Sequence, residues 1–161
     1  MGYQPKEESY FTPDKVADNF CGTSMRSSGF YLAKKDEITL WRYQKDGQYN
    51  ILADGEKISL YDFEKLETED KYAVFLGGNH GRVDIKSNEG EREHLLIIRD
   101  SFADSIVPFL AIHYDITLID LRYYTDSVRR LTEKENIDDV LIFENISEIS
   151  TAKNISILAM E

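Results

Sequence analysis

The sequence has little of several features that would point directly to a function. Its 161 residues include one cysteine, Cys21, and three prolines. A lone cysteine cannot form an intrachain disulfide and offers too few ligands for a metal site, so we interpret Cys21 as a small buried apolar side chain and expect no metal or other cofactor. No apolar run is long enough to cross a membrane. The first fifteen residues lack a signal-peptide core and suggest no element of their own.

Positive charge is also scarce. Lys and Arg number 19 against 30 Asp and Glu, which gives a net charge of −11, and no basic stripe is present. Nucleic acids and anionic membrane surfaces both need a basic face, so we expect neither a nucleic-acid partner nor membrane contact from this segment. A hydrophobic fraction of 42% and a charged fraction of 30% are typical of a globular protein, and the length favours one domain.

The chain divides near residue 92, and the region 1–92 is rich in short segments that resemble strands. Alternating apolar and polar residues, or short apolar runs, predict strands over 37–44, 49–55, 57–63, 72–78 and 81–87. Asp46–Gly47 predicts a hairpin turn after the first of these, and Asp54–Gly55 predicts a second turn. We therefore expect a small antiparallel β region packed on the core.

In the region 93–161, apolar strands alternate with helical patterns. We predict strands over 93–99, 115–122 and 138–145, helices over 101–114 and 125–136, and a short final helix or turn over 146–154. Pro108 should kink or divide the first helix, and Thr125 or Asp126 should cap the second. This order is typical of a βαβαβ unit with parallel strands, and the continuous apolar runs fit burial on both faces of the sheet.

Polar residues follow these strands at the end where α/β sheets place their sites, the carboxyl ends of the strands. The candidates that we expect to meet at this rim are Asp100, Ser101, Arg122, Asn145 and, after the apolar run 72–78, Asn79 and His80. Together they would bring a hydroxyl, a guanidinium, a carboxamide and an imidazole to one edge of the sheet.

Each candidate also has a purely structural interpretation. Ser or Asp before an apolar helix is the commonest helix cap, so Ser101 could serve only in that role. Arg122 could pair with a neighbouring carboxylate at the surface, Asn145 could cap the last helix, and the loop around His80 could be a glycine turn. We favour Asp100 as the cap, which leaves the Ser101 hydroxyl to point outward.

The segment "LLIIRDSFADSIVPFLAIHYDITLIDLRYY" (95–124) resembles the central segment of the bacterial DHHW-motif proteins. These are similar to the alginate O-acetyltransferase-like branch of the SGNH hydrolase superfamily. Segments 18–31, 36–43 and 77–86 resemble the same family, so the resemblance covers nearly the whole chain. It implies an α/β fold with a three-layer α/β/α, SGNH or flavodoxin-like parallel sheet, and an extracytoplasmic or cell-envelope location in a bacterium.

The resemblance also implies roles for individual residues. In SGNH enzymes a Gly-Asp-Ser block carries the nucleophile. Here Arg99–Asp100–Ser101 stands in its place, with Arg99 instead of glycine. Ser101 would be the nucleophile, and Asn145, with Arg122, would help to bind the oxyanion. The triad Asp and His of the family lie in an upstream Asp-His-His-Trp motif that this sequence does not contain. The chain therefore resembles the C-terminal portion of such a protein, with His80 as a candidate substitute base.

Two functions follow from these observations. The first is a cell-envelope acyltransferase or esterase that transfers or removes O-acetyl groups on a glycan through Ser101, nearly inactive in this portion alone because a serine without a base is a poor nucleophile. The second is a non-catalytic domain on the same fold that binds an envelope glycan or protein. A phosphate or nucleotide binder ranks last, because no glycine-rich phosphate loop occurs. Absent N-terminal strands would leave a sheet edge unpaired, which puts this fragment at risk of dimerisation or strand exchange through that edge.

Overall fold

A computed structural model describes residues 4–29, 32, 34–44, 49–146 and 155–158. It is a mixed α/β structure with more strand than helix, in which six strands form one sheet in the order β4-β3-β5-β7-β6-β8. Neither of the sheets in the described ranges closes into a barrel. The six strands are β3 (Tyr49–Ala53), β4 (Glu56–Lys57), β5 (Arg82–Ser87), β6 (His94–Arg99), β7 (Asp115–Ile119) and β8 (Asp139–Phe143).

The large sheet is parallel on one side and antiparallel on the other. β6 runs parallel to β7 and to β8, whereas β5 runs antiparallel to β7 and β3 runs antiparallel to β5. The parallel β6, β7 and β8 confirm the predicted order of strands in the second half of the chain. Because β5 pairs with β7, the sheet is continuous across residue 92, and the division of the chain at that point stays a prediction.

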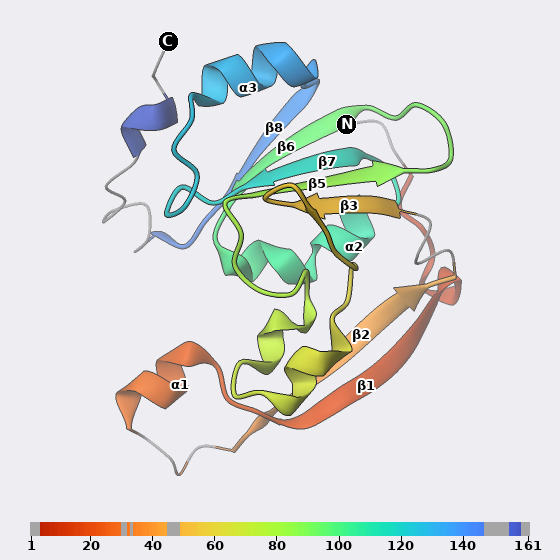
Figure 1. The fold of residues 1–161 in the computed structure, drawn as a ribbon. Helices are drawn as coiled ribbons and strands as arrows, with labels where there is room; N and C mark the ends of the chain where they lie inside the picture. Colours follow the sequence, from red (N-terminus) through yellow and green to blue (C-terminus); the bar gives the residue numbers. More distant parts are fainter. Residues whose placement is uncertain (1–3, 30–31, 33, 45–48, 147–154, 159–161) are drawn as a thin grey trace.

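Two strands lie outside this sheet. β1 (Phe11–Phe20) and β2 (Asp36–Tyr43) pair with each other in a separate antiparallel sheet, below the main sheet in Figure 1. The predicted hairpin that joins segments 37–44 and 49–55 is therefore wrong, since β2 pairs with β1 and β3 pairs with β4 and β5. Asp46–Gly47 lies outside the described residues. The expectation of no element in the first fifteen residues is also wrong, because β1 begins at Phe11 and follows a short 3-10 helix, η1 (Glu8–Tyr10).

Short helices connect the strands. They are α1 (Thr23–Ser28), η2 (Phe63–Glu67), η3 (Lys71–Val74), η4 (Ser101–Ser105), α2 (Val107–Leu110), α3 (Val128–Glu135) and η5 (Ile155–Leu158). The predicted helix over 101–114 is divided into η4 and α2, and Pro108 lies in the first turn of α2, where its missing N–H costs nothing. Ser127 caps α3 by accepting a hydrogen bond from Arg130 N at 3.3 Å, so Thr125 and Asp126 are not the cap. The predicted element over 146–154 lies outside the described residues, apart from Ile146.

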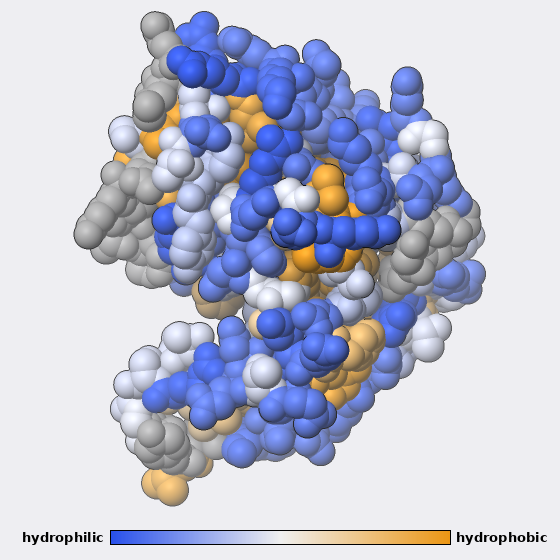
Figure 2. All heavy atoms as spheres, viewed as in Figure 1, coloured by the Kyte–Doolittle hydropathy of each residue, from blue (hydrophilic) through white to orange (hydrophobic). Residues whose placement is uncertain are grey.

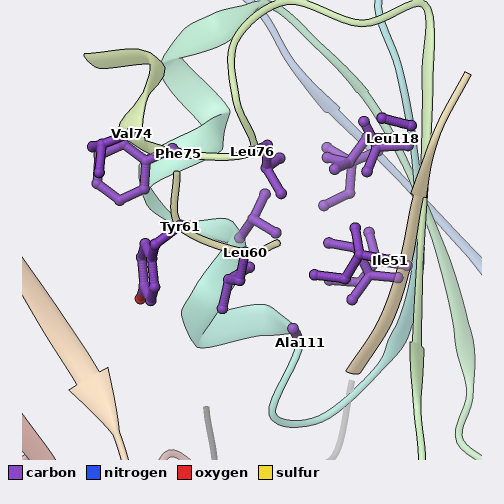
Figure 3. Packing of buried hydrophobic residues seen from close by; sticks show 14 of the residues in the cluster. Ile51, Leu60, Tyr61, Val74, Phe75, Leu76, Ala111 and Leu118 are labelled. Atoms are coloured by element: carbon purple, nitrogen blue, oxygen red, sulfur yellow. The ribbon is translucent and has the colours of Figure 1, made fainter. Parts of the chain in front are cut away.

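Apolar side chains pack on both faces of the sheet. Along β6 they alternate between two clusters, with Leu95 and Ile97 in one and Leu96 and Ile98 in the other. The second cluster includes residues of α3 and η5. Figure 3 shows the first cluster, in which Ile51 and Leu118 of the sheet face Leu60, Leu76 and Ala111 across the core. No helix of the described residues is long and apolar enough to span a membrane.

Two predicted strands, 57–63 and 72–78, are mostly irregular. β4 covers only Glu56–Lys57, and a single bridge joins Tyr61 to Phe75. Much of segment 72–78 instead forms η3 and a turn. The apolar run is explained by burial rather than by pairing, because Val74 and Leu76 are fully buried and fill the first cluster (Figure 3).

β8 is the least buried of the parallel strands. Val140 is 53% exposed and Ile142 is 57% exposed, so the expected burial on both faces holds for β6 but fails for β8. β8 ends the strand order, and within the described ranges no strand pairs with its outer edge. In the space-filling view of Figure 2, the largely hydrophilic surface is interrupted by hydrophobic patches.

Candidate functional site

The candidate residues follow neighbouring strand ends. Ile98 of β6 pairs with Ile119 of β7 and with Ile142 of β8, so these three carboxyl ends lie side by side. β5 runs the other way and pairs Arg82 with Ile119, so its beginning lies at the same rim. The loop with His80 therefore joins the rim that carries Ser101, as the sequence predicts.

Asp100 caps η4 and also holds the end of β8. Its Oδ1 accepts a hydrogen bond from Phe102 N at 2.9 Å, and its Oδ2 accepts one from Asn145 N at 2.7 Å. Asp100 is 4% exposed. The prediction that Asp100 is the cap is confirmed. Ser101 is the first residue of η4, is partly exposed, and takes no part in this capping.

Asn145 is brought to the Ser101 turn through its backbone. The hydrogen bond from Asn145 N to Asp100 fixes the main chain there, and the residue itself is exposed. A carboxamide is a suitable hydrogen-bond donor to a negatively charged oxygen. Its role in binding an oxyanion stays a prediction.

Arg122 is held by Asp120, the residue that directly follows β7. Asp120 Oδ1 accepts hydrogen bonds from Arg122 N and Nε, both at 2.9 Å, and Asp120 Oδ2 accepts one from Arg122 Nη2 at 2.6 Å. Asp120 is 1% exposed whereas the Arg122 side chain is 39% exposed. The carboxylate is therefore buried, and this pair is more firmly fixed than the surface ion pair that the sequence suggested.

Arg99 is the last residue of β6, directly before Asp100, and is fully buried. Its Nε lies 3.3 Å from Asp104 Oδ1, and its Nη1 lies 3.5 Å from Asp120 Oδ2. Burial raises the pKa of Asp104 to about 7, and Arg99 opposes that rise. Neither Asp104 nor the role of Arg99 was predicted from the sequence. The sequence signal that could have indicated them is that Arg99 directly continues the apolar run 95–98, with Asp104 shortly after it and Asp120 after the next strand.

His80 lies at the rim but is not directed at Ser101. Its Nε2 is 3.0 Å from Leu76 O, and its Nδ1 is 3.4 Å from Asp54 Oδ2. Two strand spacings of about 4.8 Å separate the beginning of β5 from the end of β6. Both ring nitrogens face acceptors, so in this arrangement neither presents a lone pair to the Ser101 hydroxyl. Neighbouring Asn79 is exposed.

The other two histidines are at the opposite rim. His94 begins β6, where its ring nitrogens contact Glu135 O at 3.1 Å and Thr117 Oγ1 at 2.9 Å. His113 precedes β7, and burial lowers its pKa. Within the described ranges, no three His, Cys, Asp or Glu side chains are grouped as metal ligands.

Comparison with solved structures identifies the fold. A DHHW family protein from Eubacterium siraeum matches with a TM-score of 0.70 and 20% identity, over 87% of this chain and 49% of that protein. This chain shares its fold with a DHHW family protein. The predicted DHHW resemblance is thus confirmed at the level of the fold. No family model and no curated protein matches the sequence.

PatB1 from Bacillus cereus also has the DHHW-like fold of this chain. A structure of PatB1 with a sulfonyl adduct matches with a TM-score of 0.71 and 18% identity, over 92% of this chain and 51% of PatB1. A second PatB1 structure matches with a TM-score of 0.67 and 20% identity, over 91% of this chain and 53% of PatB1. The chain therefore spans about half the length of the solved structures that it matches.

Proposed function

We propose that this chain is the C-terminal part of a bacterial cell-envelope acyltransferase or esterase of the SGNH type, which transfers or removes O-acetyl groups on a glycan. The observation that carries the proposal is the position of Ser101. It begins η4 directly after the buried strand β6, while Asp100 does the capping. The likeness to PatB1 adds support, since sulfonyl reagents form adducts with activated nucleophiles and PatB1 is known with a sulfonyl adduct.

In the proposed reaction, Ser101 Oγ attacks the acyl carbonyl and gives its proton to a base. The negative charge then forms on the carbonyl oxygen, for which the Asn145 carboxamide and the Arg122 guanidinium are the proposed hydrogen-bond donors. Collapse of this intermediate breaks the bond to the leaving oxygen, which takes the proton from the base. The acyl group stays on Ser101 until a glycan hydroxyl or water accepts it.

The base is proposed to come from outside this chain. Both ring nitrogens of His80 face acceptors, and the two other histidines lie at the opposite rim. Loss of the base removes most of the rate of a serine hydrolase, so the 161-residue chain alone should be nearly inactive. We also propose that further segments complete a three-layer α/β/α sheet around β8.

The test compares variants of the intact protein on a chromogenic acetate ester. Ser101→Ala should lower kcat by about 10³-fold or more. Ser105→Ala is the matched control, since Ser105 lies in the same short helix and its hydroxyl donates to Phe102 O at 3.4 Å. Wild-type turnover by Ser101→Ala would show that Ser101 is structural and would remove the proposal.

A non-catalytic role in binding an envelope glycan or protein is the second candidate. The observation in its favour is that no histidine of this chain is directed at Ser101. In that case the intact protein binds a glycan array, Ser101→Ala binds it equally well, and neither form turns over acetate esters.

A further inference from the structure

A buried cation, Arg99, ends β6 two residues before Ser101. Arg99 is 0% exposed, and none of its three guanidinium nitrogens makes a hydrogen bond to a described residue. Among the described residues, its ion-pair partners are Asp104 at 3.3 Å and Asp120 at 3.5 Å. A buried ion pair with imperfect geometry does little for stability, because desolvation offsets the attraction.

The two partners of Arg99 belong to the two sides of the site. Asp104 lies in η4, three residues after Ser101. Asp120 follows β7 and binds Arg122. Asp120 Oδ2 is shared, because it contacts Arg99 Nη1 at 3.5 Å and Arg122 Nη2 at 2.6 Å. A continuous path of charged contacts thus runs from the Ser101 turn to Arg122.

The path itself holds two carboxylates and two guanidinium groups, and the negative charge of nearby Asp100 also acts on Asp104. With Asp100 included, the five groups carry one excess negative charge when all are ionised. Asp100 and Asp120 accept several N–H donors, whereas Asp104 Oδ1 is buried without a hydrogen bond to any described residue. Asp104 is therefore the carboxyl group that most readily takes up a proton, in line with its pKa of about 7.

One further titratable group packs against η4. The Tyr72 hydroxyl donates to Phe102 O and accepts from Ser105 N, both at 3.3 Å. Burial raises the pKa of Tyr72, so this hydroxyl remains neutral near pH 7 and does not compete with Asp104 for the proton.

We propose that Arg99, Asp104 and Asp120 are positioning residues, which set the position of the Arg122 guanidinium relative to the Ser101 turn. That position depends on whether Asp104 is charged. When Asp104 is ionised, it shares Arg99 with Asp120. When Asp104 is protonated, Arg99 moves toward Asp120 and competes with Arg122 for the shared Oδ2. This coupling follows from the contacts of Arg99 with Asp104 and Asp120. Its effect on catalysis rests on the proposed function.

The experiment follows three signals of the full 161-residue chain by NMR from pH 5 to pH 9. These are the carboxyl carbon of Asp104, the Nε–H group of Arg122 and the backbone amide of Ser101. All three should shift with one common midpoint near pH 7. Asp104→Asn should remove this step from Arg122 and Ser101, whereas Asp18→Asn, the same change at an exposed position, should keep it.

Two results would overturn the proposal. One is that the Arg122 and Ser101 signals do not follow the Asp104 midpoint in the wild-type chain, a result that needs no variant. The other is that the step persists in Asp104→Asn. Neither depends on acyl chemistry. If the three signals titrate together but Ser101→Ala keeps full turnover, the network stands and the proposed function is rejected. If the signals do not titrate together but Ser101→Ala loses turnover, the proposed function stands and the network is rejected.

Discussion

The carboxylate of Asp100 accepts a hydrogen bond from the backbone N–H of Asn145, 45 residues later in the chain, at 2.7 Å. The same carboxylate caps η4 through Phe102 N. One buried side chain therefore fixes the start of the helix that carries Ser101 and the main chain of Asn145 beside it. The predicted nucleophile and a predicted oxyanion ligand are held in place by a residue whose own role is structural.

Replacing Asp100 should destabilise the fold strongly. Asp100→Ala leaves two backbone N–H groups without their acceptor, and we expect a loss of about 3 kcal/mol in the free energy of unfolding. Asp100→Asn keeps one acceptor oxygen and should lose about half as much. Urea unfolding measures both values. Equal stability of Asp100→Ala and the wild type would contradict the capping role.

The stability of the protein should fall as pH rises toward 7, because Asp104 has a raised pKa in the folded state. Between pH 3.8 and about 7 the folded chain keeps the Asp104 proton that the unfolded chain releases, so this contribution is present at low pH and is lost as the pH reaches about 7. The full difference corresponds to about 4 kcal/mol at most. Asp104→Asn should lack this component of the pH dependence.

The measurement is urea unfolding at several pH values from 5 to 8. Asp18→Asn serves as the control, because it removes the same charge from an exposed position and should keep the wild-type slope. A slope in Asp104→Asn identical to that of the wild type would show that Asp104 does not carry the proton.

Self-association should depend on the outer edge of β8. Ile142 is 57% exposed on an edge strand, and exposed apolar edges promote pairing between chains. Ile142→Lys should weaken a concentration-dependent dimer in sedimentation velocity and leave thermal stability nearly unchanged. Leu32→Lys changes an exposed apolar residue outside β8 and should leave the dimer intact. A dimer of equal strength in both variants would place the contact elsewhere.

Asp54 should be important for the turn next to His80. It accepts hydrogen bonds from Arg82 N at 2.9 Å and Gly81 N at 3.3 Å, and its own φ is 49°. Asp54→Ala loses both acceptors and puts alanine in the left-handed region, so we expect a loss of about 2 kcal/mol. Asp54→Asn keeps an acceptor and tolerates this φ, and should lose much less. Chemical denaturation measures the free energy of unfolding of both variants. Equal losses in Asp54→Ala and Asp54→Asn would contradict this role of Asp54.

The sequence predicts strands well where the local pattern determines burial. The apolar run of β6 and the alternation of β5 are sufficient to predict these two strands. Asp54–Gly55 correctly predicts the turn between β3 and β4. β1 could not be found in this way, because "FTPDKVADNF" has little alternation and contains a proline. Its strand conformation depends on pairing with β2, a long-range contact.

Segments 57–63 and 72–78 were wrongly predicted as full strands because their apolar residues are buried without regular backbone pairing. Leu60, Val74 and Leu76 are as apolar and as buried as strand residues, yet they reach the core from irregular segments. Periodicity reports burial and cannot show which backbone groups are paired. The Arg99 network was missed for a related reason, since Asp104 and Asp120 meet Arg99 only after η4 and β7 are in place.

The mixed direction of the strands has a practical consequence for labelling this protein. Because β5 runs opposite to β7, the turn at Asp54–Gly55 and the loop 76–81 both lie on the Ser101 side of the sheet. The connection 88–93, between the end of β5 and the start of β6, lies on the other side. A fluorophore or an inserted tag at 88–90 would report on the molecule without approaching Ser101.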